Sequence, residues 1–158
     1  MIPVKICGIT NLSDAMACIK HGATALGFVL ADSKRKVDPA TVYDIARQLP
    51  PFVTRVGVFV DEDPLVIRDI LRDCSLDMAQ LHGSESVAIT EVLPHRVIKT
   101  FKAGYEQPTT PEVVRWQNTP LRAALIDTYS PTISGGTGQS FDWDLFKAFR
   151  VWVDFWDL

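Results

Sequence analysis

The chain has 158 residues, a mass of 17.6 kDa and a formal charge of −3, so it fits a single domain that is large enough to bury a core. Its Lys and Arg residues are scattered, which excludes a basic surface for nucleic acid. No apolar run approaches the roughly 20 residues of a membrane span, and the start MIPVKICG lacks a leader pattern, so we expect a cytoplasmic protein. The three cysteines include no CxxC pair, which argues against disulfides or a metal site, so we expect free thiols.

Short β-branched runs alternate with helical patterns along almost the whole chain. This alternation is typical of repeated βα units around a parallel sheet, and the sequence predicts an α/β fold with six such units. We expect their strands at 4–7, 25–30, 55–60, 77–81, 96–101 and 121–127.

The first three predicted helices have clear start signals. Asn11 can cap a helix from Leu12 that ends at Gly22. The pairs Asp38-Pro39 and Asp63-Pro64 each combine a capping carboxylate with proline at the first helical position. We expect Val42, Ile45, Ala46 and Leu49 to face inward on the second helix, and Ile67, Ile70 and Leu71 on the third.

The later helices have weaker patterns. We expect one capped at Ser84 and running to Leu93, one after Pro111 with Val113, Val114 and Trp116 as its apolar members, and one over about 142–149. No linker divides the chain, which predicts one domain over 1–158. The tail 151–158, VWVDFWDL, is atypical and could form a short seventh strand.

Cys7 ends the first predicted strand beside Gly8. In parallel α/β proteins chemistry collects where strands give way to loops. A thiolate there, favoured by a helix N-terminus or a cation, could act as a base or nucleophile. The alternative is a small buried apolar residue, which is the reading we prefer for Cys18 and Cys74.

Asp127 ends the sixth predicted strand. Its carboxyl group could order the following loop, or it could be a general acid or base in a partly dry site. If the sheet curls into a barrel, Cys7 and Asp127 would face one mouth. A base and an acid on opposite sides of a small substrate suit an isomerisation.

Three further features could bind a ligand. The glycine-rich stretch that includes Gly135, Gly136, Thr137 and Gly138 could be a lid or an anion nest, or only a loop. Arg35 could hold a carboxylate in a bidentate fork, although a solvated charge run is an alternative. His82 could donate to a ligand or pack beside Gly83.

Six blocks together resemble the phosphoribosylanthranilate isomerase family of tryptophan biosynthesis: VKICGIT, GFVL with SKR, RVGVFV, QLHGSE, VIKTF, and LIDT with GGTGQSFDW. The resemblance runs from Val4 to about Phe149. It implies a (βα) barrel of the TIM type truncated to about six units. An open flavodoxin-like sheet is disfavoured separately, because neither a phosphate loop nor a switch-point signature appears near the first strand.

The resemblance also implies a reaction and its residues. The reaction is the Amadori rearrangement of N-(5-phosphoribosyl)anthranilate, a phosphorylated small molecule, without a cofactor. Cys7 would be the general base and Asp127 the general acid. Arg35 would hold the anthranilate carboxylate, and the loop Gly135 to Gly138 would fold over the substrate.

The blocks of the family's last two βα units, which bind the substrate phosphate, are not found in this chain. Their loss predicts a higher KM and a lower kcat. An unclosed barrel leaves open strand edges, so we expect two chains to associate there as a homo-oligomer. The competing hypothesis is a catalytically inactive barrel fragment that serves as a structural or interaction module.

Overall fold

The computed structural model describes residues 2–103 and 110–128. The chain divides into two compact units, Met1–Glu85 and Ser86–Leu158. Predictions for the helix at 142–149 and for the tail at 151–158 lie outside the described residues.

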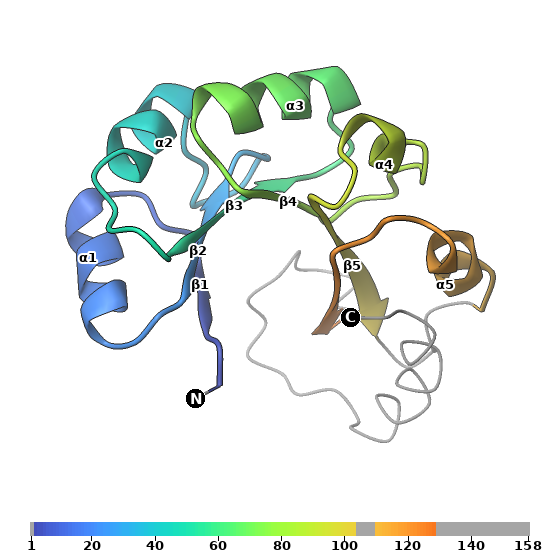
Figure 1. The fold of residues 1–158 in the computed structure, drawn as a ribbon, viewed down its shortest axis with the longest axis horizontal. Helices are drawn as coiled ribbons and strands as arrows, with labels where there is room; N and C mark the ends of the chain where they lie inside the picture. The colour runs from blue at the N-terminus through green and yellow to red at the C-terminus, as the bar shows by residue number, and fades with distance from the viewer. Residues whose placement is uncertain (1, 104–109, 129–158) are drawn as a thin grey trace. The chain divides into compact units, whose positions relative to one another are not determined.

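The first unit alternates strands and helices throughout, as predicted (Figure 1). Its elements are β1 (Lys5–Cys7), α1 (Leu12–Lys20), β2 (Ala25–Val29), α2 (Pro39–Ala46), β3 (Thr54–Phe59), α3 (Pro64–Asp73) and β4 (Met78–Leu81). Each of the four strands pairs in parallel with the next one in sequence. Parallel neighbours need a crossover connection, and α1, α2 and α3 supply it.

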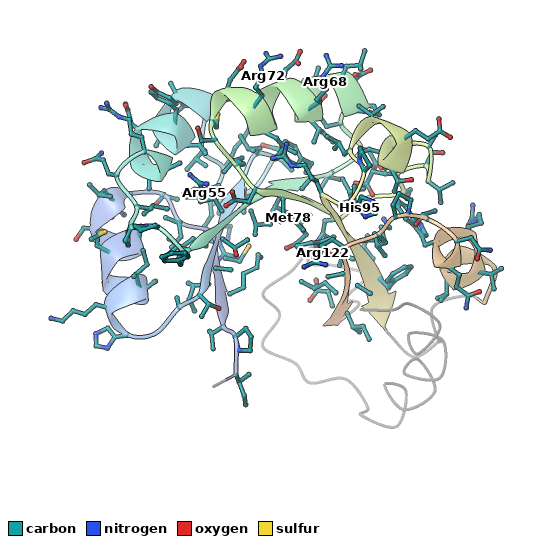
Figure 2. All side chains as sticks on the ribbon, viewed as in Figure 1. Arg55, Arg68, Arg72, Met78, His95 and Arg122 are labelled. Carbon is teal, nitrogen blue, oxygen red and sulfur yellow. The ribbon has the colours of Figure 1, made fainter. Side chains whose placement is uncertain are left out.

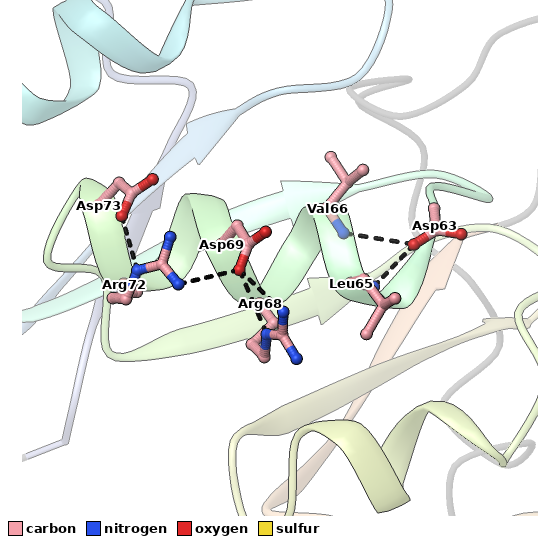
Figure 3. Close-up of polar contacts among 7 residues, drawn as sticks. All are labelled: Asp63, Leu65, Val66, Arg68, Asp69, Arg72 and Asp73. Atoms are coloured by element: carbon pink, nitrogen blue, oxygen red, sulfur yellow. Dashed lines mark hydrogen bonds and ion pairs between the residues drawn. The ribbon is translucent and has the colours of Figure 1, made fainter.

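The predicted caps of these three helices are confirmed. The side chain of Asn11 accepts a hydrogen bond from the Asp14 N–H at 2.9 Å, and Asp38 Oδ1 accepts one from the Thr41 N–H at 2.9 Å. Asp63 Oδ1 accepts from Leu65 at 2.8 Å and from Val66 at 3.3 Å (Figure 3). Each carboxylate or amide satisfies backbone donors that the helix itself leaves unpaired.

The strand register assigns the residues of the first sheet to two faces. One face carries fully buried apolar side chains, namely Leu26, Phe28, Ala79 and Leu81, and α1 to α3 lie on one side of these strands (Figure 1). We call this the covered face. The opposite face, which we call the open face, carries Lys5 and Cys7, both half-buried. One part of the core of this unit therefore lies between the covered face and the helices, and Val56 and Val58 are buried on the open face.

The outward surface of α3 is held by charged pairs. Arg72 contacts Asp69 at 3.1 Å and Asp73 at 2.7 Å, and Arg68 contacts Asp69 at 3.1 Å (Figure 3). Arg68 and Arg72 extend from the helix away from the strands (Figure 2). Exposed pairs of this kind add little stability, so burial of Ile67 and Leu71 anchors the helix.

Arg55 forms a stronger pair at the start of β3. Its Nε and Nη2 donate to the two carboxylate oxygens of Asp77 at 2.9 and 2.8 Å, and its backbone N–H donates to Asp77 Oδ2 at 2.8 Å. This partly buried fork raises the pKa of Arg55. It fixes the position at which the chain enters β4.

The second unit contains α4 (Ile89–Val92), β5 (Val97–Ala103), α5 (Thr110–Gln117) and β6 (Ala123–Thr128). β5 and β6 pair in parallel. The Lys99 ammonium lies 5.6 Å from the centre of the Trp116 ring, and both residues are almost fully buried. This cation–π contact joins β5 to α5.

One prediction about the later helices was wrong. The helix expected from Ser84 to Leu93 is only the single turn α4, which begins at Ile89. Ser84 lies in the loop before it, where its N–H donates to Asp61 Oδ1 at 2.6 Å. The helix expected after Pro111 is α5, and of its apolar members Val113 and Trp116 are buried, whereas Val114 is 44% exposed.

None of the helices in the described part of the chain is long and apolar enough to cross a membrane.

Candidate active site

Cys7 is the last residue of β1, and its Cα is paired with that of Gly27 on β2. The next two N–H groups, those of Gly8 and Ile9, both donate to the Gly27 carbonyl oxygen, at 2.9 and 3.0 Å. Gly8 has φ +88, a left-handed conformation that suits glycine. The turn after β1 is therefore fixed, and the half-buried Cys7 thiol lies at the carboxyl end of the sheet.

Arg35 comes from the loop between β2 and α2, and the structure brings it to Cys7. Its Nη1 donates to the Cys7 carbonyl oxygen at 2.7 Å. The guanidinium also lies over Gly8, where an added Cβ would be 2.5 Å from Nη1. Only a residue without a side chain leaves room for the guanidinium here, so Gly8 allows the two predicted site residues, Cys7 and Arg35, to meet.

The sequence prediction missed two residues on the same face, Lys5 and Gly27. Lys5 lies two residues before Cys7 on β1, and a Cβ added at Gly27 would lie 2.8 Å from Cys7 Sγ and 3.0 Å from Lys5 Nζ. The period of two in strands could have identified Lys5, because residues i and i+2 share a face. The need for glycine at position 27 could not be read without the strand register.

His82 follows β4, and its backbone N–H donates to the Phe59 carbonyl oxygen at 2.9 Å. Its Nδ1 lies 3.5 Å from Nε2 of Gln80, two residues earlier on the strand. Gln80 is 4% exposed, and its Oε1 has no hydrogen-bond partner among the described residues. The imidazole is thus positioned at a strand end beside a buried amide, where sequence reasoning had left a ligand role and a packing role open.

Asp127 lies in the second unit, next to the end of β6, and is half-buried. Its Cα partner across the sheet is Lys102 of β5. Paired residues of parallel strands present their side chains on the same face, so an exposed lysine neighbours the predicted acid. Sequence reasoning missed Lys102, because the pairing of β5 with β6 was not resolved to single residues.

The remaining site predictions concern Gly135, Gly136, Thr137 and Gly138, which lie outside the described residues. The two other cysteines behave as packing residues. Cys74 is buried, its Sγ donates to the Pro39 carbonyl oxygen at 3.2 Å, and burial raises the pKa of this thiol. Cys18 is half-buried on α1.

Over the described ranges, no group of three or more His, Cys, Asp or Glu side chains is placed to hold a metal ion. The side chains that can do chemistry are a thiol, a carboxyl group and several cations. Such a set can move protons and hold anionic groups.

Comparison with known proteins gives one consistent match. The profile of the family described as N-(5'-phosphoribosyl)anthranilate (PRA) isomerase matches residues 4–152. An N-(5'-phosphoribosyl)anthranilate isomerase from Desulforudis audaxviator is 43% identical over 150 residues, which cover 95% of this chain and 72% of that relative.

Two solved structures give the fold. The phosphoribosyl anthranilate isomerase from Thermotoga maritima superposes with a TM-score of 0.84 at 39% identity, over 96% of this chain and 73% of that one. A phosphoribosyl anthranilate isomerase in complex with reduced 1-(o-carboxyphenylamino)-1-deoxyribulose 5-phosphate gives 0.78 at 36% identity, over 96% and 72% of the two chains. The fold is a (βα) barrel of the TIM type, of which this chain carries about six units, as the sequence predicted.

Proposed function

This chain belongs to the N-(5'-phosphoribosyl)anthranilate isomerase family, an aldose–ketose isomerase of tryptophan biosynthesis, and we propose that Cys7 and Asp127 are the base and the acid of its reaction. The reaction converts N-(5-phosphoribosyl)anthranilate to 1-(2-carboxyphenylamino)-1-deoxyribulose 5-phosphate. The observation that carries the proposal is the 2.7 Å hydrogen bond from Arg35 to the Cys7 carbonyl oxygen. It places a guanidinium, a group that can bind carboxylates, next to the backbone of the strand-end residue that carries the thiol.

In the first step, the carboxyl group of Asp127 donates a proton to the ribose ring oxygen. The bond between that oxygen and the anomeric carbon breaks, and the nitrogen lone pair forms the C=N bond of a protonated Schiff base. Asp127 becomes a carboxylate. Its position next to the end of β6 supports this role, because strand ends are where TIM barrels carry catalytic groups.

In the second step, the Cys7 thiolate removes the proton from C2 of the sugar. The C–H electron pair forms the C1–C2 double bond, the C=N pair returns to nitrogen, and an S–H bond forms. The resulting enolamine tautomerises to the ketone. Each step needs only one positioned proton donor or acceptor, and such groups contribute about 10²- to 10⁴-fold to rates.

Arg35 would bind the carboxylate of the anthranilate ring. The only hydrogen bond recorded from its guanidinium in the described ranges is the one to Cys7, so further donors of the fork are available. His82, at the end of β4, would contact the substrate, and Gly135 to Gly138, with Thr137, would form the lid. Each of these assignments is part of the same proposal.

An assay that follows loss of anthranilate fluorescence tests the function. We expect Cys7→Ala and Asp127→Asn each to lower kcat/KM by about 10³-fold, because each removes one proton-transfer group. Cys18→Ala, which removes a thiol from α1, is the matched control and should leave kcat/KM unchanged.

If activity is at buffer level and neither substitution lowers it, the enzyme proposal is wrong. The competing hypothesis, a barrel that serves as a structural or interaction module, would then be favoured. Loss of activity in Cys18→Ala as well would indicate general damage to the fold.

We also propose that residues 1–158 form one barrel domain, with 151–158 as an added tail, and that two chains associate through the edge at β1. The continuous family match supports a single domain. In the described part of the chain β1 pairs only with β2, and Ile2, Val4 and Ile6 near this edge are 84%, 44% and 38% exposed. A relative from Thermotoga maritima is described as dimeric.

Light scattering at increasing concentration measures this association. We expect a mass above 17.6 kDa, and we expect Ile2→Lys to lower it, because a charge would be placed at an exposed edge. A constant mass of one chain at all concentrations would contradict the proposal.

A cytoplasmic location completes the proposal. It is supported by the three free thiols of Cys7, Cys18 and Cys74, because reducing compartments keep cysteines in this state.

A further inference from the structure

Lys5 lies two residues before Cys7 on β1, so the two side chains share the open face. Both are half-buried. A lysine at such a position loses part of its hydration and restricts a long side chain, and each effect costs free energy. The role of Lys5 in the site therefore needs a physical reason.

Gly27 shows where the lysine head lies. The point at which a Cβ of residue 27 would stand is 3.0 Å from Lys5 Nζ and 2.8 Å from Cys7 Sγ. The Cα of Lys5 is paired with Ala25, whereas its ammonium reaches the level of Gly27. The lysine side chain thus runs along β2 toward the carboxyl end of the sheet, and its charge lies beside the thiol.

The charged groups around Cys7 in the first unit are few. Arg35 donates to the backbone carbonyl oxygen of Cys7, and β2 carries no ionisable side chain. Asp14 of α1 is bonded to Asn11 at 2.8 Å. No ion pair of Lys5 with an acid is recorded in the described ranges, so its ammonium acts on Cys7 without a neutralising partner there.

We propose that Lys5 is a positioning residue that places a positive charge beside the Cys7 sulfur over Gly27. A neighbouring cation favours the reaction of a sulfur as a base or a nucleophile. Lys5 takes no part in the proton transfer itself, in which the C–H bond of the substrate breaks and the S–H bond of Cys7 forms. The inference rests on the proposed function for its catalytic meaning, but not for its test.

The test measures the rate at which iodoacetamide alkylates Cys7 between pH 6 and 9, with peptide mass spectrometry to separate it from Cys18 and Cys74. Iodoacetamide is neutral, so the lysine charge does not attract it. We expect Lys5→Met to slow alkylation at pH 7 by about tenfold, because the reacting sulfur loses the neighbouring positive charge. Lys5→Arg should retain the wild-type rate.

Lys20→Met is the matched control, because it removes the same charge from the exposed end of α1. It should alkylate at the wild-type rate. Equal rates in the wild type, Lys5→Met and Lys20→Met would overturn the proposal, and so would an equally slow Lys5→Arg.

A second variant keeps the proposal testable if Lys5→Met does not fold. Lys5→Gln removes the charge but keeps a polar side chain, and it should also slow Cys7 alkylation at pH 7. A wild-type alkylation rate in Lys5→Gln overturns the proposal. Because alkylation requires no turnover, an inactive enzyme with a lysine-dependent thiol would contradict the proposed function alone.

Discussion

The two faces of the sheet formed by β1 to β4 differ in the side chains that they carry. On the covered face, Leu26, Phe28, Ala79 and Leu81 are completely buried, so these positions contribute apolar area. On the open face, Val56 and Val58 are also buried, whereas Lys5 and Cys7 keep part of their surface accessible. The covered face thus provides stability, and the open face combines stability with chemistry.

One polar group on the open face lowers the stability of the fold. Gln80 lies on this face, in register with Val58, and its buried Oε1 has no hydrogen-bond partner in the described ranges. An unpaired buried acceptor costs about 1–3 kcal/mol. A face selected only for stability would carry an apolar side chain there, so the open face is shaped by another requirement.

Each face also contains one glycine that gives space to a neighbour. Gly27, on the open face, leaves room for Cys7 and Lys5. Gly57 is paired with Phe28 on the covered face, and an added Cβ would lie 2.7 Å from the Phe59 ring. Adding one methyl group at either position therefore separates the two roles.

The largest effect should come from Gly27→Ala. The methyl group would push aside Cys7 Sγ and Lys5 Nζ, and misplacing a reacting group by about 1 Å costs about 100-fold in rate. We expect kcat to fall by about that factor in the fluorescence assay. The urea midpoint should change less than the rate, because the two nearest atoms are side-chain ends and alanine reduces the entropy of the unfolded chain, although the Cys7 Cα at 3.2 Å must also shift slightly.

Gly57→Ala is the matched substitution on the covered face and should give the reverse result. The new methyl group meets the Phe59 ring and Leu76 in a packed core, and such overpacking costs about 1–3 kcal/mol. We expect the free energy of unfolding to fall by about 2 kcal/mol, with kcat per folded molecule unchanged. If both variants lose activity and stability together, the two faces are not separate.

Where local chemistry decides, the fold could be predicted from the sequence. The pairs Asp38-Pro39 and Asp63-Pro64 predicted the starts of α2 and α3 to the residue, because capping depends on two or three neighbouring residues. The same reasoning failed at Ser84, where no helix begins and where the N–H donates to Asp61, 23 residues earlier. A contact with so distant a residue cannot be read from a local pattern.

The candidate site was predictable in part for a similar reason. Their positions at strand ends identified Cys7 and Asp127 as candidate site residues. The family resemblance assigned them the roles of general base and general acid, and these roles stay predictions. The contact of Arg35 with Cys7 depends on the absence of a side chain at Gly8, and the position of Lys5 depends on the register of β1 against β2. The register of two strands depends on how they pair, so it cannot be predicted from the sequence of either strand alone.

The smallest effect concerns the cap of α2, a helix that packs on the covered face. The Thr41 N–H and then the Thr41 hydroxyl donate to the Asp38 carboxylate and lower its pKa. A carboxyl group with a lowered folded-state pKa adds stability above its unfolded value of about 3.9, and this stability is lost as the pH falls through the folded value. We therefore expect the wild-type urea midpoint to decline between pH 5 and 2.

Asp38→Asn isolates that contribution, because asparagine caps helices comparably and does not titrate. Its midpoint at pH 7 should be close to that of the wild type, and it should decline less steeply in acid. Thr41→Val removes the hydroxyl donor but keeps the N–H donor, so its acid dependence should be intermediate. Equal slopes in all three proteins would show that the ionisation of Asp38 adds no stability, whereas a loss of Cys7 alkylation in Asp38→Asn at pH 7 would show that the two faces are coupled.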